Sequence, residues 1–508
     1  MTQGIDFSSG EFDSIVEKKE GSVAYLRSYL AGEWWSGTEW LEVRSPIDAS
    51  LLARVPRVGR TESEAMLARL YEKGRWEFRD IPGGRRLEIF HGVADRLANL
   101  QPDFVSALML NAGKTKQQAT SEVKASVERL RHSDLDTREI LGDYVPGDWS
   151  EETTETEAVV RREPVGVVLA VVPFNYPLLD AVSKLVYSAI AGNAVAIKPA
   201  TSTPLPALML AKVLELAGLP KHCFAVFTMP GADVGALAAD RRIAAISLTG
   251  SSKTGLEILH SAGLKQFVLE LGGGDPAIVL EDAEVQLAAE RIASGIVGFA
   301  GQRCDAIKLV LAEKKVYSAL KEQLAARLGR IKVGDPRQEG VEMGPLIDAE
   351  TARQFEQGIN DAVRLGGRLV VGDGKADRNY VRPALVEMPR QTLTETTLYR
   401  NEIFAPVALL TQVESGEDAL RFANGRQYGL DAAIFGTDMN KVRRLARLLE
   451  VGAVYINDTP KHGIGYFPFG GRKDSGIGRE GIGYTIDHVT AMKSIIYNYK
   501  GKGIWEYL

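Results

Sequence analysis

The 508-residue sequence predicts an α/β protein with two Rossmann-like parallel-sheet domains and a small additional β element. From Val165 to Thr249, short apolar runs alternate with amphipathic segments, and a second alternation begins near Pro276. Repeated strand–helix–strand units give parallel sheets that bind nucleotides at the carboxyl ends of their strands. The chain is also too long for one simple core. Between Arg138 and Val160 a polar, acidic stretch flanked by β-forming residues predicts an excursion outside the main sheets, or a solvated loop.

The first alternation predicts a strand from Val165 to Val172, which Pro173 ends, and then a helix from Leu178 to Ala191. The remaining elements follow the same order of strand and helix. Strands are expected at Ala194 to Ile197, Phe224 to Thr228 and Ala244 to Thr249, and helices at Pro206 to Ala217 and Ala232 to Ala239.

The second alternation predicts a second α/β domain. Its strands are expected at Pro276 to Leu280, Ile307 to Leu311, Arg368 to Val371 and Val407 to Thr411. The β-rich run from Met492 to Tyr499 could be the partner strand of the excursion.

Composition restricts the class of protein. With 45% hydrophobic and 25% charged residues, and a net charge of -5, the chain is an ordinary globular protein and not a nucleic-acid or anionic-membrane binder. No run approaches the ~18 apolar residues of a membrane span. The N-terminus shows no secretory signal, so a cytoplasmic location is expected. The 2 cysteines and 6 scattered histidines predict neither a disulfide framework nor a metal site.

Cys304 and Glu270 are of the residue types that oxidise an aldehyde together. A thiolate adds to the carbonyl carbon, and a carboxylate activates the water that hydrolyses the resulting thioester. Taken alone, Cys304 could equally be an inert small hydrophobe and Glu270 a solvated strand end. The other cysteine, Cys223, opens a run typical of a buried strand and is expected to be structural.

Two glycine-containing turns are candidates for phosphate binding. The literal GxGxxG from Gly476 to Gly481 follows a polar loop instead of a hydrophobic strand, so a dinucleotide site there is not expected. The turn Thr249-Gly250-Ser251 lies between a predicted strand and a predicted helix, where backbone N–H groups can approach a phosphate. By itself this turn could also be a purely structural connection.

An ordered series of motifs resembles that of the NAD(P)-dependent aldehyde dehydrogenase superfamily. The motifs are Pro173-Phe174-Asn175-Tyr176-Pro177, Lys198-Pro199-Ala200, Leu248-Thr249-Gly250-Ser251, Glu270-Leu271-Gly272-Gly273, Gly301-Gln302-Arg303-Cys304, Glu402-Ile403-Phe404-Ala405-Pro406 and Pro468-Phe469-Gly470-Gly471. The resemblance implies an aldehyde dehydrogenase-like fold. It divides the chain into a cofactor-binding domain (1–137 and 159–271), a catalytic domain (272–470) and oligomerisation segments (138–158 and 485–508) of a homotetramer.

The resemblance also implies catalytic roles. Cys304 would be the nucleophile, with the side-chain amide of Asn175 and the backbone N–H of Cys304 holding the oxyanion. Glu270 would activate the hydrolytic water. Family members that pass the acyl group to coenzyme A or phosphate lack this glutamate, so the chain is expected to release a free acid irreversibly.

Cofactor residues follow from the same resemblance. They are Pro173, Phe174, Lys198, Thr201, Gly231, Gly235, Thr249, Gly250, Ser251, Leu271, Glu402 and Phe404. Lys198 would reach the adenosine ribose or its 2′-phosphate, and Glu402 the nicotinamide ribose, with Phe404 beside the ring. NAD-specific relatives commonly carry a glutamate where this chain has Thr201, so NADP is expected, with NAD possible as a second coenzyme.

Three stretches, at residues 301–308, 173–177 and 456–468, resemble those of the non-phosphorylating glyceraldehyde-3-phosphate dehydrogenases of the superfamily, particularly the archaeal branch. Arg303 and Tyr176 are therefore expected to bind a phosphorylated substrate together with Asn175, although Arg303 could instead form a structural salt bridge. Relatives place an arginine where this chain has Ala125, so that contact is in doubt, and Lys461 and His462 would substitute for it.

Two alternatives to glyceraldehyde 3-phosphate oxidation stay open. A succinate semialdehyde or lactaldehyde dehydrogenase would also use Arg303. A non-catalytic structural homologue would need none of the residues Cys304, Glu270, Asn175 and Lys198 that this chain carries.

Overall fold

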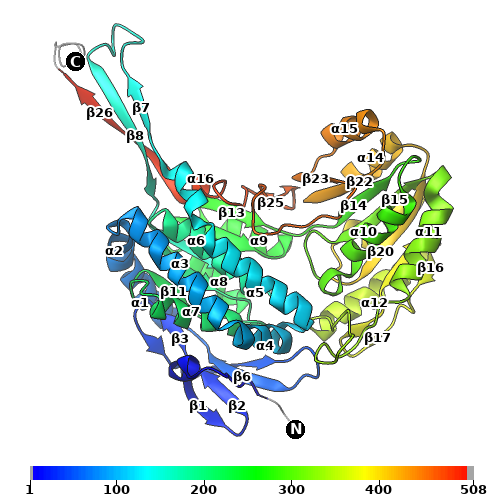
Figure 1. The fold of residues 1–508 in the computed structure, drawn as a ribbon, viewed down its shortest axis with the longest axis horizontal. Coiled ribbons are helices and arrows are strands. Elements are labelled where there is room, and N and C mark those ends of the chain that lie inside the picture. The colour runs from blue at the N-terminus through cyan, green and yellow to red at the C-terminus, as the bar shows by residue number, and fades with distance from the viewer. Residues whose placement is uncertain (1–3, 500–508) are drawn as a thin grey trace.

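The computed structural model describes residues 4–499 and contains two helix-covered sheets with a projecting arm (Figure 1). The first sheet has eight strands, and its central five run parallel, with antiparallel strands at both edges. In spatial order these are β25 (Gly476–Ile477), β13 (Gln266–Glu270), β12 (Ala245–Thr249), β9 (Val167–Val171), β10 (Ala194–Lys198), β11 (Phe224–Val226), β3 (Ser28–Leu30) and β4 (Trp34–Trp35).

Both faces of the first sheet are buried, which explains the continuous apolar run of β9. Val168 and Ala170 pack into one hydrophobic cluster, whereas Val167 and Leu169 pack into another. The first cluster lies under α2 (Arg75–Arg79), α3 (Gly83–Asn99), α4 (Gln101–Ala112), α5 (Lys116–Arg131), α6 (Leu179–Ile190) and α7 (Leu205–Leu216). The second lies under α1 (Arg60–Arg69), α8 (Val234–Ala238) and α9 (Ser252–Ala262).

The second sheet has seven strands and is likewise covered on both faces. In order they are β16 (Arg368–Val371), β19 (Ala384–Glu387), β20 (Val407–Val413), β15 (Ile307–Glu313), β14 (Asp275–Val279), β22 (Asp431–Phe435) and β23 (Ala453–Ile456). Helices α12 (Ala349–Arg364), α13 (Thr397–Arg400), α14 (Gly416–Asn424) and α15 (Met439–Leu448) cover one face, and α10 (Val285–Val297) and α11 (Lys314–Leu328) the other.

The predicted alternation is confirmed, with ends that shift by a few residues. One strand departs from the parallel pattern, because β16 pairs antiparallel with β19 at the sheet edge. The GxGxxG stretch is also not a strand-to-helix turn, since it contains β25, which pairs antiparallel with β13. This crossing of the chain back to the first sheet was not predicted.

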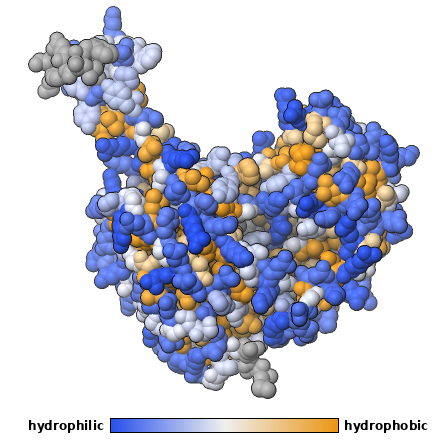
Figure 2. All heavy atoms as spheres, in the orientation of Figure 1, coloured by the Kyte–Doolittle hydropathy of each residue, from blue (hydrophilic) through white to orange (hydrophobic). Residues whose placement is uncertain are grey.

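The predicted excursion is a three-stranded antiparallel arm that projects from the body (Figure 1). It consists of β7 (Asp143–Pro146), β8 (Thr156–Pro164) and β26 (Thr490–Asn498), which follows the short helix α16 (Ile486–Val489). Its pairing confirms the predicted partner strand, and residues 500–508 of the predicted C-terminal segment lie outside the described residues. Figure 2 shows apolar side chains toward the base of the arm.

Smaller elements complete the chain. They are the sheet of β1 (Val16–Glu20), β2 (Val23–Leu26), β6 (Leu51–Pro56) and β5 (Trp40–Arg44), and the pairs β17 (Ala376–Asp377) with β18 (Tyr380–Val381) and β21 (Tyr428–Gly429) with β24 (Arg472–Lys473). Among the described residues, no helix has the length and apolar character needed to span a bilayer.

Candidate active site

Cys304 lies in the loop between α10 and β15, directly after a left-handed turn. Phe299, Ala300 and Gly301 have φ angles of 48°, 54° and 68°. A non-glycine residue in this region costs about 1–3 kcal/mol, so surrounding contacts must hold the turn. Cys304 itself is partly exposed, and burial together with the nearby carboxylates of Asp305 and Glu402 raises the pKa of its thiol well above the usual range. The thiol therefore needs a change in its surroundings, or a base, to become a nucleophile.

The turn is held by Lys308, on the buried strand β15. Its ammonium donates hydrogen bonds to the carbonyl oxygens of Gly301, at 2.8 Å, and Ala405. Burial lowers the pKa of Lys308 to about 7. Lys308 thus joins the turn before the nucleophile to the loop that carries Glu402. Sequence reasoning missed this role, although a lysine within a strand of otherwise apolar, buried residues was a signal.

Asn175 reaches the loop of Cys304 from the other sheet. The residue is 4% exposed, and its side-chain amide donates a hydrogen bond to the Gln302 carbonyl oxygen at 3.0 Å. Its Oδ1 accepts one from the Tyr176 N–H at 3.1 Å. The amide is thereby held beside the loop of Cys304, as an oxyanion donor requires. That role stays a prediction.

Glu270 ends β13 and is 1% exposed. Within the described residues neither of its carboxylate oxygens has a hydrogen-bond partner. Burial, followed by the charge of Glu480, raises its pKa well above the usual range. Gly470 leaves room for the carboxylate, because a Cβ atom there would lie 2.8 Å from Glu270 Oε1. A buried carboxyl without partners is suited to hold a water molecule and accept its proton.

A buried ion pair that sequence reasoning missed lies near this base. Lys184 Nζ is 2.8 Å from Glu480 Oε2, and both side chains are almost fully buried. The positive charges of Lys184 and Arg479 lower the pKa of Glu270 and so oppose the effect of burial. They favour the ionised form that a general base needs.

The predicted cofactor residues line the carboxyl ends of the parallel strands. Lys198 ends β10 and Thr249 ends β12, where it pairs in register with Glu270. Burial lowers the pKa of Lys198 to about 8. No residue in the described part of the chain forms a hydrogen bond or ion pair with its ammonium. Ser251 caps α9 by accepting a hydrogen bond from the Thr254 N–H.

Other predicted cofactor residues flank these ends. Gly231 opens a short 3-10 helix that leads into α8, which contains Gly235. Thr201 donates a hydrogen bond to the Met229 carbonyl oxygen, and Leu271 packs closely against Gly255.

The remaining predicted cofactor residues lie where the two sheets meet. The ring of Phe174, which follows Pro173, lies 5.7 Å from that of Phe404 in an edge-to-face contact. Glu402 accepts a hydrogen bond from the Gly273 N–H at 2.9 Å, and burial raises its pKa to about 7. Phe174, Phe404 and Glu402 are thus brought near the loop of Cys304, and their contacts with a cofactor stay a prediction.

The predicted substrate residues are only partly brought together. Arg303 donates hydrogen bonds to Asp305 at 2.8 Å and to the Pro460 carbonyl oxygen at 2.7 Å, so the alternative of a structural salt bridge is present in this structure. Lys461 is 62% exposed in its side chain and pairs with Asp458. The ring of His462 lies 4.1 Å from that of Phe469 at a tilt of 42°, and its Nδ1 has no hydrogen-bond partner among the described residues.

Tyr176 lies beneath a cation that the sequence did not suggest. Lys114 Nζ is 4.1 Å from the centre of the Tyr176 ring and 4.6 Å from that of Phe299, and it pairs with buried Glu122.

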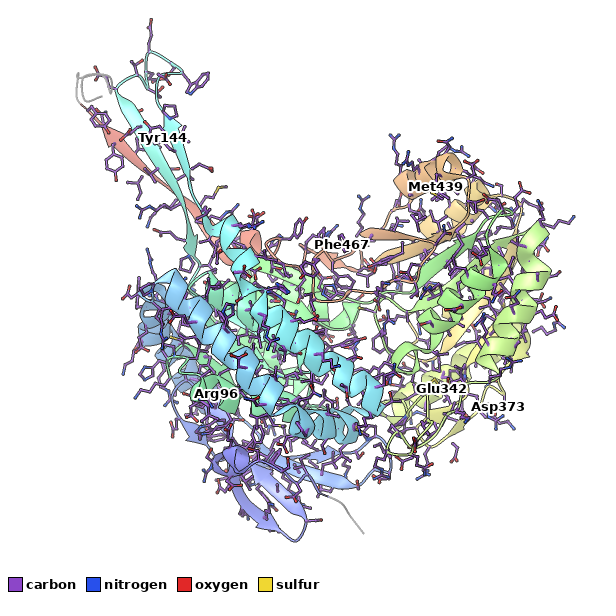
Figure 3. All side chains as sticks on the ribbon, in the orientation of Figure 1. Arg96, Tyr144, Glu342, Asp373, Met439 and Phe467 are labelled. Carbon is purple, nitrogen blue, oxygen red and sulfur yellow. The ribbon has the colours of Figure 1, made fainter. Side chains whose placement is uncertain are left out.

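Figure 3 places the exposed ring of Phe467, which belongs to the same segment as His462, between the two main parts of the molecule, where the surface in Figure 2 is hollowed.

Comparison with known proteins decides the family. The model of the "Aldehyde dehydrogenase family" matches residues 34–495. The chain belongs to this family. An NADP-dependent glyceraldehyde-3-phosphate dehydrogenase of Streptococcus equinus is 34% identical over 93% of this chain and 98% of its own. A lactaldehyde dehydrogenase of Methanococcus aeolicus is 31% identical over 93% and 100% of the two chains.

A solved structure supports the same family for this aldehyde dehydrogenase. The NADP-dependent glyceraldehyde-3-phosphate dehydrogenase of Bacillus halodurans, crystallised with NADP, superposes with a TM-score of 0.89 at 31% identity and covers 93% of this chain and 99% of its own. The predicted fold class is confirmed, and so is the predicted class of enzyme.

Proposed function

We propose that this aldehyde dehydrogenase oxidises glyceraldehyde 3-phosphate to 3-phosphoglycerate with NADP, and that the reaction is irreversible. The observation that carries the proposal is the arrangement of Cys304, Asn175 and Glu270 where the two sheets meet. Two proteins to which this chain is similar are glyceraldehyde-3-phosphate dehydrogenases, and this supports the choice of substrate.

Each residue has one task in the proposed mechanism. The Cys304 sulfur, in the thiolate form that the last step regenerates, attacks the aldehyde carbon, and the amide of Asn175 stabilises the oxyanion that forms. NADP, when bound, supplies the acceptor for the two electrons of the aldehyde C–H bond. Glu270 then takes a proton from water, which attacks the thioester carbon and releases the acid and the Cys304 thiolate.

The donors at the strand ends fit NADP. An unpaired, buried Lys198 ammonium suits a phosphate, and no carboxylate stands at position 201 to repel one. Since Thr201 and Lys198 are both compatible with a free ribose hydroxyl as well, NAD is proposed as the weaker second coenzyme.

Coenzyme choice can be tested at Thr201. The variant Thr201→Glu is expected to lower kcat/KM for NADP by roughly 10- to 100-fold, because the added carboxylate repels the 2′-phosphate, while NAD is affected far less. Initial rates with both coenzymes measure the change, and Thr201→Gln is the uncharged control of equal size. An unchanged NADP to NAD ratio in Thr201→Glu would place the 2′-phosphate elsewhere.

Lactaldehyde is a second candidate substrate, favoured by one observation. Arg303 already donates to Asp305 and Pro460, which leaves fewer cationic donors for a phosphate group. A relative that is a lactaldehyde dehydrogenase supports the same alternative. Glyceraldehyde 3-phosphate and lactaldehyde share a hydroxyl group next to the aldehyde carbon, so both are 2-hydroxyaldehydes.

The substrate is tested by initial rates with NADP on glyceraldehyde 3-phosphate, glyceraldehyde, lactaldehyde and succinate semialdehyde. The proposal expects a kcat/KM for glyceraldehyde 3-phosphate at least ~100-fold above that for glyceraldehyde, because charge-assisted hydrogen bonds to phosphate are worth several kcal/mol together. Equal values for the two would refute the phosphorylated substrate. A preference for lactaldehyde would select the second candidate.

We further propose that the arm joins copies of the chain into a homotetramer. Its strands expose apolar side chains, among them Tyr144 at 58%, Met492 at 70% and Ile496 at 67%. Exposed apolar patches of this kind mark contact surfaces. A monomeric mass in sedimentation analysis would contradict this assembly.

A further inference from the structure

Asp180 is a carboxyl group in the first turn of α6. Its backbone N–H donates to the Tyr176 carbonyl oxygen at 3.0 Å, as part of the helix. Within the described residues its side chain forms no hydrogen bond and no ion pair. Asp180 is also partly exposed, whereas its neighbours Leu178, Leu179 and Ala181 are buried.

The helix geometry places Asp180 beside the reacting centre. Asp180 and Lys184 are four residues apart on α6 and share one face, and Tyr176 lies in the turn that precedes the helix, where its carbonyl oxygen accepts from the Asp180 N–H. At one end of this face, Lys114 bridges the rings of Tyr176 and Phe299, which precedes the nucleophile.

At the other end, Lys184 pairs with Glu480, whose charge acts on Glu270. Asp180 lies close enough to Cys304 to interact with it electrostatically. Asp180 therefore lies near the nucleophile, on the same helix as the lysine that pairs with Glu480.

Three other carboxylates in this region have partners. Glu122 pairs with Lys114 and accepts hydrogen bonds from the N–H groups of Leu178 and Leu179. Glu480 pairs with Lys184, and Glu402 accepts from Gly273. The Asp180 side chain is partly exposed and has no partner among the described residues, so it can bind water or a ligand.

The protonation state of Asp180 also suits an uncharged ligand group such as a hydroxyl group. Burial, opposed by the charge of Lys184 and aided by those of Glu480 and Glu122, raises the pKa of Asp180 to about 8. At pH 7 the carboxyl group is therefore mostly protonated. In this form it both donates and accepts hydrogen bonds, as a hydroxyl group does, and it does not repel a phosphate.

We infer that Asp180 binds the 2-hydroxyl group of the substrate and thereby selects 2-hydroxyaldehydes over aldehydes that lack this group. The inference rests on the proposed function for the position of the aldehyde carbon, between Cys304 and Asn175. The second carbon is bonded directly to the first, and α6 begins at Leu179, shortly after Asn175, so the proposal places the hydroxyl group beside the first turn of this helix. Asp180 is then a specificity-determining residue.

The experiment compares two aldehyde pairs that differ only in the hydroxyl group, lactaldehyde with propanal and glyceraldehyde 3-phosphate with 3-phosphooxypropanal. Asp180→Leu is expected to lower kcat/KM for the hydroxylated member of each pair by about 10- to 100-fold, and to leave the deoxy member within about threefold. Asp180→Asn, which keeps a donor and an acceptor, should restore most of the loss. Glu128→Gln, on the exposed side of α5, is the matched control for removal of a carboxylate.

Two results would overturn the inference. Equal losses for both members of each pair would mean that Asp180 acts on Cys304 or on the fold and not on the hydroxyl group. Unchanged rates in Asp180→Leu would mean that the hydroxyl group lies elsewhere. The lactaldehyde and propanal pair carries no phosphate, so it tests Asp180 even if the phosphorylated substrate proves wrong.

Discussion

Replacement of Cys304 by serine is expected to lower the steady-state rate of NADPH formation by at least ~10³-fold, with no pre-steady-state burst. A serine hydroxyl is a far weaker nucleophile than a thiolate, and the proposed function assigns Glu270 to the hydrolytic water and not to the activation of this hydroxyl group. The thiohemiacetal, and hence the thioester, cannot form at a useful rate. Stopped-flow absorbance of NADPH measures both phases.

The chain offers a matched control in its other cysteine. Cys223 is 2% exposed, and its thiol donates a hydrogen bond to the Gly74 carbonyl oxygen at 3.3 Å. Cys223→Ser keeps a donor of similar size, so turnover should stay within about twofold. Loss of the burst in Cys223→Ser, or a normal rate in Cys304→Ser, would contradict the assignment of Cys304 as the nucleophile.

The candidate reacting groups could be predicted because their chemistry is carried by residue type and order. Cys304, Glu270 and Asn175 each stand in a short motif, whereas the pairing of Thr249 with Glu270 at neighbouring strand ends was not predicted and comes from the structure. Strand periodicity was equally reliable, since β9 is buried on both faces and needs a continuous apolar run.

What the sequence could not predict depends on which side chains face one another. Lys308 and Asp180 are ordinary residue types, and only the fold shows that one reaches two carbonyl oxygens while the other reaches none. Arg303 is the intermediate case. Its position beside the nucleophile suggested both a substrate contact and a salt bridge, and the choice depends on Asp305 and Pro460, from two different segments.

The same limit applies to β25. A two-residue strand has no periodicity to detect, and its pairing with β13 arises because the chain returns to the first sheet after the second is complete. This return brings Gly470 and Glu480 against Glu270, so part of the base's environment comes from a segment distant in sequence.

Replacement of Glu270 by glutamine is expected to separate the two halves of the reaction. Acylation needs Cys304 and Asn175, so a burst of about one NADPH per site should remain. Deacylation loses its base, so the steady-state rate should fall by roughly 10²–10⁴-fold. Glu257→Gln, an exposed carboxylate on α9, is the control that should leave both phases unchanged.

The pH dependence of deacylation is a second, independent test of the role of Glu270. Burial and the charge of Glu480 raise the pKa of Glu270, and only the deprotonated carboxylate can accept a proton from water. The wild-type deacylation rate should therefore rise with pH as Glu270 ionises, and the rise should disappear in Glu270→Gln, where nothing titrates at this position. If the deacylation rate still rises with pH in Glu270→Gln, another group must act as the base. Glu480 is then the first candidate, because its charge has the largest effect on Glu270.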